Sequence, residues 1–273
     1  MITNAATALV TGATGAIGRA IAHALAAEGA HVAVAGRRDR ALRDLAASLP
    51  GGYRHLAIAG DLRKRAALPE FLASVQDAVG PLDILVNNAA VEHCSAFDQL
   101  TTAEIDEIIT VNLTAPLELT RLVTPGMLAR GHGHVVFISS LSGYAGTAYQ
   151  APYAATKGAL NALVQSLRAE YAHRPIGFSL VAPGSVGGEG MFARGQADGI
   201  RVPRALRLTT ANDVAHAVVR AIRTDAPQTL VYPGPIKPSL ALGVLAPKTA
   251  ERLNQHLGIA TLFRPAAETR GRV

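Results

Sequence analysis

The sequence predicts an α/β fold, with one domain built on a doubly wound, parallel, seven-stranded sheet. Short apolar runs rich in Val, Ile and Leu alternate with longer segments of helical periodicity as far as residue 232. This alternation is typical of parallel strands joined by crossover helices. The chain has 273 residues, of which 49% are hydrophobic, and this is enough to form a substantial core within a single domain.

Seven strands and six helices are expected in alternation. The strands are predicted at residues 6–10, 31–35, 55–59, 82–86, 135–139, 177–181 and 229–232. The helices are predicted near residues 17–28, 39–48, 66–78, 102–129, 153–172 and 211–223. Because a helix separates each strand from the next, every connection can cross over the sheet and the strands run parallel.

Two segments fall outside this alternation. Residues 184–208 are long, glycine-rich and carry four arginines, and a connection of this length in a compact domain indicates a functional lid. Residues 236–273 form a C-terminal extension beyond the main domain of residues 1–235. We expect one helix near residues 247–257 in this extension and a polar, disordered end.

Composition excludes several classes of function. The single cysteine, Cys94, allows no intrachain disulfide and no zinc site built from several thiolates, and no metal site is expected. The net charge of +6 is dispersed and there is no Trp, which argues against a nucleic-acid partner. No apolar stretch reaches the roughly 20 residues of a membrane span. No basic residue precedes the first apolar run, so a cytoplasmic location is expected.

The first predicted strand ends in Gly12, Gly15 and Gly18 and turns directly into a helix. Such a turn presents backbone N–H groups and the positive end of the helix dipole. Glycine there lets a pyrophosphate approach the backbone and lets the helix pack on the strand. The pattern therefore predicts a dinucleotide site, and the alternative is a purely structural strand–turn–helix connection.

The residues after the second predicted strand favour NADP (NADPH) as the cofactor. An acidic residue is expected there when the ribose 2′-hydroxyl is free, but Gly36 occupies that place and Arg37 and Arg38 follow it. An arginine offers a planar fork of donors that suits a 2′-phosphate. The alternative is an ordinary surface arginine.

Tyr153 and Lys157 are four residues apart and so share one face of a predicted helix. A phenol has an ordinary pKa of about 10, and a neighbouring ammonium group lowers that pKa by favouring the phenolate. Tyr153 could then exchange a proton with a carbonyl or alcohol oxygen as general acid or base. Taken alone, the pair is unspecific, because an ordinary helix face explains most pairs of this spacing.

Several motifs occur in a fixed order along the chain. They are the glycine turn, Asn87-Asn88-Ala89-Ala90, Asn112, Ser139-Ser140, Tyr153 with Lys157, and Pro183-Gly184. Together they resemble the short-chain dehydrogenase/reductase family, in its single-domain form with a Rossmann fold, over essentially residues 5–232. The glycine motif is atypical, because Ala16 stands where that form usually has glycine. The observed spacing resembles the branch that includes sugar-nucleotide epimerases and dehydratases.

The resemblance implies roles for the matching residues. Tyr153 is implied as the proton donor or acceptor, Lys157 as the residue that lowers its pKa and binds the nicotinamide ribose, and Ser140 as a hydrogen-bond partner of the reacting oxygen. Asn112 matches an asparagine whose helix distortion holds a water in the proton relay. The resulting catalytic set is Asn112, Ser140, Tyr153 and Lys157.

A larger set is predicted to bind the cofactor. It comprises Gly12, Thr14, Gly15, Ile17, Gly18, Arg37, Arg38, Asp61, Leu62, Asn88, Ala89, Tyr153, Lys157, Pro183, Gly184 and Val186. By resemblance, the pair at 61–62 lies at the adenine ring, Asn88 beside the cofactor, and the turn at 183–186 at the nicotinamide.

The leading functional hypothesis is an NADP-dependent oxidoreductase that transfers a hydride between its cofactor and a small, moderately apolar carbonyl or alcohol substrate. Loops 91–95 and 141–150 and the lid, with Met191 and Phe192, are the candidate substrate contacts. The arginines of the lid would attract an acidic substrate or simply solvate the lid. An epimerase or dehydratase with tightly bound cofactor and a non-catalytic nucleotide sensor are the alternatives. A homodimer or homotetramer is expected.

Overall fold

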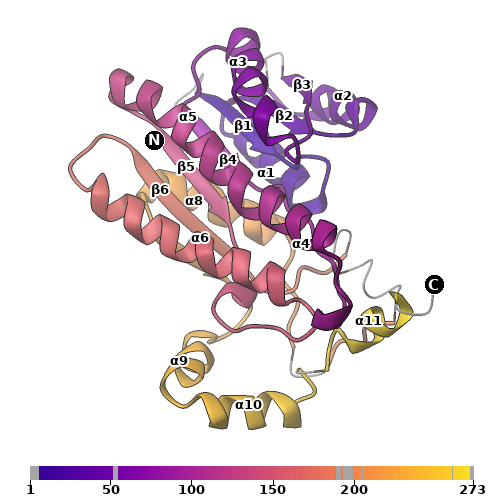
Figure 1. The fold of residues 1–273 in the computed structure, drawn as a ribbon. Helices are drawn as coiled ribbons and strands as arrows, with labels where there is room; N and C mark the ends of the chain where they lie inside the picture. Colours follow the sequence, from indigo (N-terminus) through magenta and orange to yellow (C-terminus); the bar gives the residue numbers. More distant parts are fainter. Residues whose placement is uncertain are drawn as a thin grey trace.

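The protein forms one seven-stranded, all-parallel sheet. The computed structural model describes residues 6–51, 55–188, 192, 199–203, 206–259 and 261–270. The strands are β1 (Thr7–Thr11), β2 (His31–Gly36), β3 (Leu56–Ala59), β4 (Ile84–Asn87), β5 (His134–Ile138), β6 (Gly177–Pro183) and β7 (Gln228–Val231). They lie in the order β3-β2-β1-β4-β5-β6-β7 (Figure 1). The predicted fold class, a single doubly wound α/β domain, is confirmed.

Helices cover both faces of this sheet. One face packs against α1 (Ala16–Ala27), α2 (Asp39–Ser48) and α8 (Ala211–Thr224), and the other against α3 (Leu68–Val79), α5 (Ala115–Arg130) and α6 (Ala151–Glu170). Figure 1 shows α5 and α6 in front of the sheet, with α1 and α8 behind it. A further helix, α4 (Thr102–Ile109), precedes α5.

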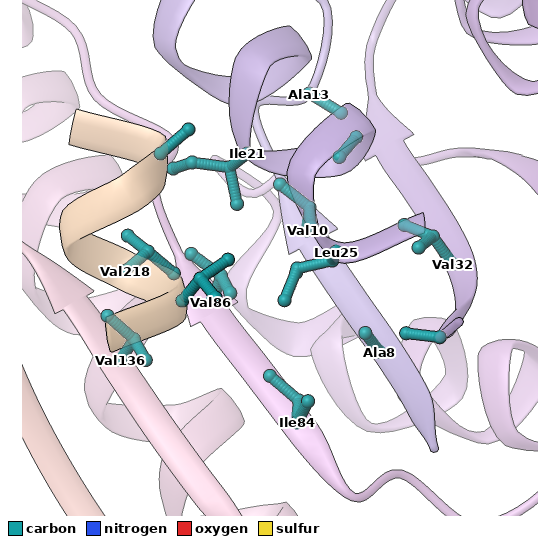
Figure 2. Close-up of a cluster of buried hydrophobic side chains, with 14 of the residues drawn as sticks. Ala8, Val10, Ala13, Ile21, Leu25, Val32, Ile84, Val86, Val136 and Val218 are labelled. Carbon is teal, nitrogen blue, oxygen red and sulfur yellow. The ribbon is translucent and has the colours of Figure 1, made fainter. Parts of the chain in front are cut away.

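Alternate residues of each strand enter opposite cores. In β1, Val10 packs against the helices of the α1–α8 face, whereas Leu9 joins the core beneath α3, α5 and α6. Figure 2 shows the first of these cores, where Ile21 of α1 and Val218 of α8 lie over Val86 of β4. Fully burying each of these aliphatic side chains contributes about 1.5–3 kcal/mol, so the sheet is held rigidly at both faces.

The strand order reverses between β1 and β4, since β2 and β3 lie to one side of β1 and all later strands to the other. In open parallel sheets, ligands bind beyond the carboxyl ends of the strands at such a reversal. The glycine turn after β1 and the Asn88 loop after β4 therefore share the position at which a binding site is expected.

The predicted single helix over residues 102–129 is divided in the structure. The π-helical segment Thr110–Thr114 separates α4 from α5. Pro116 has no backbone N–H, so the carbonyl of Asn112 lacks the donor that an α-helix supplies four residues later. A wider π turn accommodates this gap, and such turns are frequent at functional sites. The helix distortion implied by the family resemblance at Asn112 is thus present.

The C-terminal extension contains more helix than its sequence pattern indicates. Besides α10 (Pro247–His256), near the predicted helix, it forms α9 (Lys237–Leu245) and α11 (Arg264–Arg270). Pro238 and Pro265 lie at the starts of these helices, where the missing N–H costs nothing. Both prolines therefore fit the first turn of a helix. Residues 264–270, which were expected to be disordered, are helical, and residues 271–273 lie outside the described part.

Among the residues that the structure describes, no helix is long and apolar enough to span a membrane. The same residues contain no cluster of three or more His, Cys, Asp or Glu side chains arranged to hold a metal ion. The lid segment is described only at 184–188, 192, 199–203 and 206–208.

Candidate active site

One cavity of about 1130 Å³ opens at the carboxyl ends of the strands. This exceeds the roughly 300–1000 Å³ of pockets that hold a single small ligand. Its lining includes almost the whole predicted site: Gly12, Thr14, Gly15, Ile17, Gly18, Arg37, Arg38, Asp61, Leu62, Asn88, Ala89, Ser140, Tyr153, Lys157, Pro183, Gly184 and Val186. Asn112 alone among the predicted site residues does not line it.

The glycine turn leaves the backbone open to the cavity. Gly12 has φ +63°, and a Cβ there would lie 2.7 Å from the Cα of Ala89. A Cβ at Gly18 would lie 2.5 Å from the carbonyl oxygen of Gly12, so both glycines are required for close packing. Among the described residues, no side chain caps the N-terminus of α1, and its first turn contains no acidic residue. The helix end that lines the cavity therefore suits an anion such as a pyrophosphate.

Thr11 and Asn88 hold this turn in place. The backbone N–H groups of Asn88 and Ala89 donate to Oγ1 of Thr11, at 3.0 and 3.1 Å. The side-chain amide of Asn88 donates in turn to the carbonyl of Thr11 at 2.8 Å. Thr11 is buried and was not singled out from the sequence. These bonds fix the ends of β1 and β4 against each other.

Two arginines lie where β2 ends. Arg37 and Arg38 are exposed and both line the cavity. Arg38 Nη2 donates to the carbonyl of Thr14 at 3.1 Å, which ties it to the glycine turn. Asp61 and Arg63 also line the cavity, and they form an ion pair with each other at 2.6 Å. Hydrogen bonds and positive charge from Arg63 hold the pKa of the Asp61 carboxyl below its ordinary value.

Ser140, Tyr153 and Lys157 converge within the cavity. Tyr153 is the third residue of α6, and Lys157 follows one turn later, with Nζ 5.5 Å from the centroid of the phenol ring. Ser140 lines the same cavity and acts on Tyr153, where it opposes the rise in the pKa of the phenol. Lys157 is only 2% exposed, and its ammonium donates to the carbonyl of Ile138 at 2.8 Å.

The surroundings perturb both titratable groups of this trio. Burial raises the pKa of the Tyr153 hydroxyl well above its ordinary value, the negative charge of Glu92 raises it further, and the hydrogen bond with Ser140 opposes these effects. Burial lowers the pKa of Lys157 to about 8. The pKa of Tyr153 is thus raised in this structure and not lowered, as its pairing with Lys157 led us to expect, because burial outweighs the other effects. The phenol is protonated at neutral pH, as a proton donor requires.

A second set of contacts clamps the strand end that carries Ser140 onto α6. Ser139 Oγ donates to Oδ1 of Asn161 at 2.7 Å and contacts the carbonyl of Lys157 at 3.1 Å. The side-chain amide of Asn161 donates to the carbonyl of Gly143 at 3.1 Å. A Cβ at Gly143 would lie 2.6 Å from the carbonyl carbon of Lys157, so glycine permits this close approach.

Asn112 lies behind the cavity rather than in its wall. Its side chain is completely buried and makes two bonds of 2.8 Å to Val91, accepting from the backbone N–H and donating to the carbonyl. The amide nitrogen also lies 3.5 Å from Oγ1 of Thr156 on α6. The π turn thus joins the loop after β4 to the helix that carries Tyr153.

Glu92 and Gln150 are cavity residues that the sequence reasoning did not single out. Glu92 Oε1 accepts a hydrogen bond from the Gln150 side-chain amide and another from Cys94 Sγ, the latter at 2.9 Å. Both Glu92 and Gln150 line the cavity. Glu92 falls in the predicted substrate loop 91–95, and a carboxylate there among apolar neighbours was the available signal. His93 instead pairs with Glu107 at 2.9 Å.

The turn after β6 lies beside β7 and lines the cavity. The backbone N–H of Gly184 donates to the carbonyl of Val231 at 3.0 Å, and a Cβ at Gly184 would lie 2.9 Å from the ring of Tyr232. Phe192 of the lid lines the cavity. Arg207 donates from its guanidinium to the carbonyl of Pro233 at 3.1 Å. Met191, Arg194 and Arg204 of the lid lie outside the described residues.

Burial of Lys157 carries a cost in stability. Its pKa is about 8 in the folded protein against an ordinary value of 10.5, a difference equivalent to about 3 kcal/mol. Replacing Lys157 would relieve this cost but would also remove its hydrogen bond to Ile138, and the loss of that bond offsets about 1 kcal/mol of the gain. Without cofactor, Lys157→Met is therefore expected to raise the free energy of unfolding by about 2 kcal/mol at pH 7. Urea denaturation measures this change.

The pH dependence of that gain has a fixed sign. Between pH 8 and 10.5 the unfolded chain binds the lysine proton and the folded protein does not, so wild-type stability rises with pH in this range. The advantage of Lys157→Met is therefore greatest below pH 8 and is lost above 10.5, where the missing bond to Ile138 leaves the variant less stable by about 1 kcal/mol. Lys248→Met, at an exposed lysine of α10, is the control and should leave stability unchanged. A destabilised Lys157→Met protein at pH 7 contradicts the prediction.

Comparisons with known proteins agree with this geometry. The chain matches the family model for short chain dehydrogenases over residues 6–198. Ketoacyl reductase HetN of Nostoc sp. is 34% identical over 270 residues, which cover 97% of this chain and 93% of that protein. D-beta-hydroxybutyrate dehydrogenase of Cupriavidus necator is 34% identical over 209 residues, covering 75% of this chain and 81% of that protein.

Solved structures of short-chain oxidoreductases are also similar to this chain. A metagenomic short-chain oxidoreductase in complex with NADP is 33% identical, with a TM-score of 0.72 and coverage of 86% of this chain and 100% of that one. An actinorhodin polyketide ketoreductase variant with NADPH is 30% identical, with a TM-score of 0.76 and coverage of 84% and 97%. The chain belongs to the short-chain dehydrogenase family and is an NAD(P)-dependent oxidoreductase.

Proposed function

We propose that the protein is an NADP-dependent oxidoreductase that interconverts a carbonyl compound and its alcohol, with Tyr153 as general acid and base. The observation that carries the proposal is the placement of Tyr153, together with Ser140 and Lys157, in the cavity that the glycine turn also lines. One cavity therefore offers both an anion-binding helix end and a positioned proton donor.

The residues present fit a nicotinamide dinucleotide. The uncapped N-terminus of α1 suits its pyrophosphate, and Arg37 offers a donor fork for a 2′-phosphate. Asp61 and Leu62 line the cavity on the side proposed for the adenine. A bound nicotinamide supplies the hydride in reduction and accepts it in oxidation.

The protein's own residues handle the proton. In reduction, Tyr153 donates its hydroxyl proton to the carbonyl oxygen, and in oxidation the phenolate takes it back. Ser140 hydrogen-bonds the same oxygen, and the bond of 3.1 Å that its Oγ accepts from the N–H of Ser142 orients it. The ammonium of Lys157 faces the phenol ring and eases formation of the phenolate. Asn112 acts indirectly, by fixing the loop at Val91 against α6.

The raised pKa of Tyr153 keeps its hydroxyl protonated at neutral pH, which is the form that carbonyl reduction uses. Burial and the negative charge of Glu92, from the loop after β4, both oppose loss of the phenolic proton. A protonated phenol is the form that donates to a carbonyl. The preference for NADP inferred from Arg37 agrees with reduction.

Glu92→Gln is expected to move the pH profile of alcohol oxidation to lower pH. Removing the negative charge lowers the pKa of Tyr153, so the phenolate that oxidation requires forms earlier. The glutamine retains an oxygen that can accept from Gln150. The measurement is kcat/KM for oxidation against pH. Glu107→Gln, which removes a carboxylate paired with His93, is the control, and an equal shift in both variants contradicts a specific role for Glu92.

An epimerase or dehydratase remains the second candidate, because the Gly12, Gly15 and Gly18 spacing favours it. A non-catalytic nucleotide sensor has no need for a phenol beside a buried ammonium, and the trio at 140, 153 and 157 argues against it. The test is a panel of ketones and alcohols with NADPH or NADP, followed by cofactor absorbance. Stoichiometric cofactor consumption supports the oxidoreductase, and product formation without consumption supports the second candidate.

A further inference from the structure

The C-terminal extension forms one side of the cavity that contains Tyr153. The residues it contributes are mostly apolar and come from α9, α10 and the segment before α11: Ile236, Ser239, Leu240, Leu242, Gly243, Pro247, Ala250, Glu251, Leu253, Asn254, Leu257, Ile259, Leu262 and Phe263. Of these, Glu251 alone is charged. The far part of the cavity is thus an apolar wall, in contrast to the polar glycine turn and arginines opposite.

The pair of helices α9 and α10 stands apart from the domain core. Figure 1 shows them below the main body, away from the sheet. Both helices are described throughout, and neither contains a buried side chain. Leu253 and Leu257 line the cavity but remain 43% and 36% exposed. Apolar surface left facing a cavity in this way marks a binding surface.

The other end of the wall is fixed by the segment before α11. Phe263 packs edge-on against Phe192 of the lid, with ring centroids 6.3 Å apart. At the first residue of α11, Arg264 Nε donates to the hydroxyl of Tyr149 at 3.1 Å, which joins the start of this helix to the loop immediately before α6. The extension is therefore anchored both to the lid and to the neighbourhood of Tyr153.

We propose that this wall binds the apolar tail of the substrate, and that the substrate is a neutral carbonyl compound or alcohol with a long aliphatic chain. The inference rests on the proposed function, since it places the reacting carbonyl at Tyr153. Continuity of the apolar wall with that cavity identifies the occupant as substrate rather than a separate partner. The wall contributes no cation, so an acidic tail would gain nothing there.

The test uses straight-chain methyl ketones from butanone upward with NADPH. For the wild-type protein, kcat/KM is expected to rise about fourfold for each added methylene group that the wall buries. Leu253→Asp and Leu257→Asp place a charge on the wall at side chains that are already partly exposed. Each is expected to reduce the ratio of kcat/KM for long over short ketones at least tenfold.

Val244→Asp and Leu245→Asp are the matched controls. These residues lie at the end of α9, are 77% and 83% exposed, and do not line the cavity, so the long-to-short ratio should stay at its wild-type value. An equal loss in these controls overturns the proposal, because it assigns the effect to the outer surface of the helix pair. Reduction of ketones with no dependence on chain length also overturns it and leaves the proposed function standing. Failure to reduce any ketone overturns the proposed function itself.

Discussion

Tyr153→Phe is expected to bind NADPH as the wild-type protein does and to reduce ketones about a thousandfold more slowly. General acid–base catalysis by a positioned side chain contributes roughly 10²–10⁴ in rate, and this substitution removes the proton while retaining the ring that packs near Lys157. Single-turnover reduction measures the rate, and calorimetric titration measures cofactor binding. Together they separate loss of chemistry from loss of the site.

Tyr144→Phe provides a matched control in the same region. The buried Tyr144 hydroxyl has no hydrogen-bond partner among the described residues, and Tyr144 does not line the cavity. Its removal should leave activity unchanged and stabilise the protein by about 1 kcal/mol. Near-wild-type activity in Tyr153→Phe, or an equal loss in Tyr144→Phe, contradicts the assigned role of Tyr153.

Arg37→Asp is expected to reduce the preference for NADPH over NADH about a hundredfold or more. Hydrogen bonds to charged groups contribute about 1.5–3 kcal/mol each, and a carboxylate in place of the guanidinium also repels a 2′-phosphate. The same carboxylate can accept from a free ribose 2′-hydroxyl, so NADH binding should improve. Calorimetric titration with both cofactors at one salt concentration gives the ratio.

Arg40→Asp controls for the change in net charge. Arg40 is exposed on α2, three residues after Arg37, and does not line the cavity. It should retain the wild-type preference. If Arg37→Asp also retains that preference, the 2′-phosphate is bound elsewhere and the assignment of NADP through Arg37 is wrong.

The sheet and most of its helices were predictable because strands buried on both faces appear as continuous apolar runs. The run at 6–10 and the glycines that follow it also located the binding edge, since the fold requires a tight turn between β1 and α1. The predicted site residues that line the cavity were found through motifs at the carboxyl ends of strands. These motifs are recognisable in the sequence because the turns that end the strands also line the cavity.

The features that were missed depend on contacts between distant residues or on backbone details. The bond between Glu92 and Gln150 joins positions 58 residues apart, and no local pattern reveals it. The division of the predicted helix at 102–129 follows from one missing N–H, at Pro116, within an otherwise helical pattern. In the extension, Pro238 lies in the first turn of α9. A proline can stand in the first turn of a helix or just beyond its end, and the local sequence does not distinguish these two positions.

The central claim is direct transfer of hydride between the nicotinamide and a carbonyl substrate in the cavity that contains Tyr153. The most direct test incubates the protein with a long-chain methyl ketone and NADPH deuterated at the transferable position, followed by mass spectrometry of the product. The account predicts one deuterium on the carbinol carbon of each alcohol and one NADPH consumed per product. Product without deuterium, formed with no net consumption of NADPH, would contradict it.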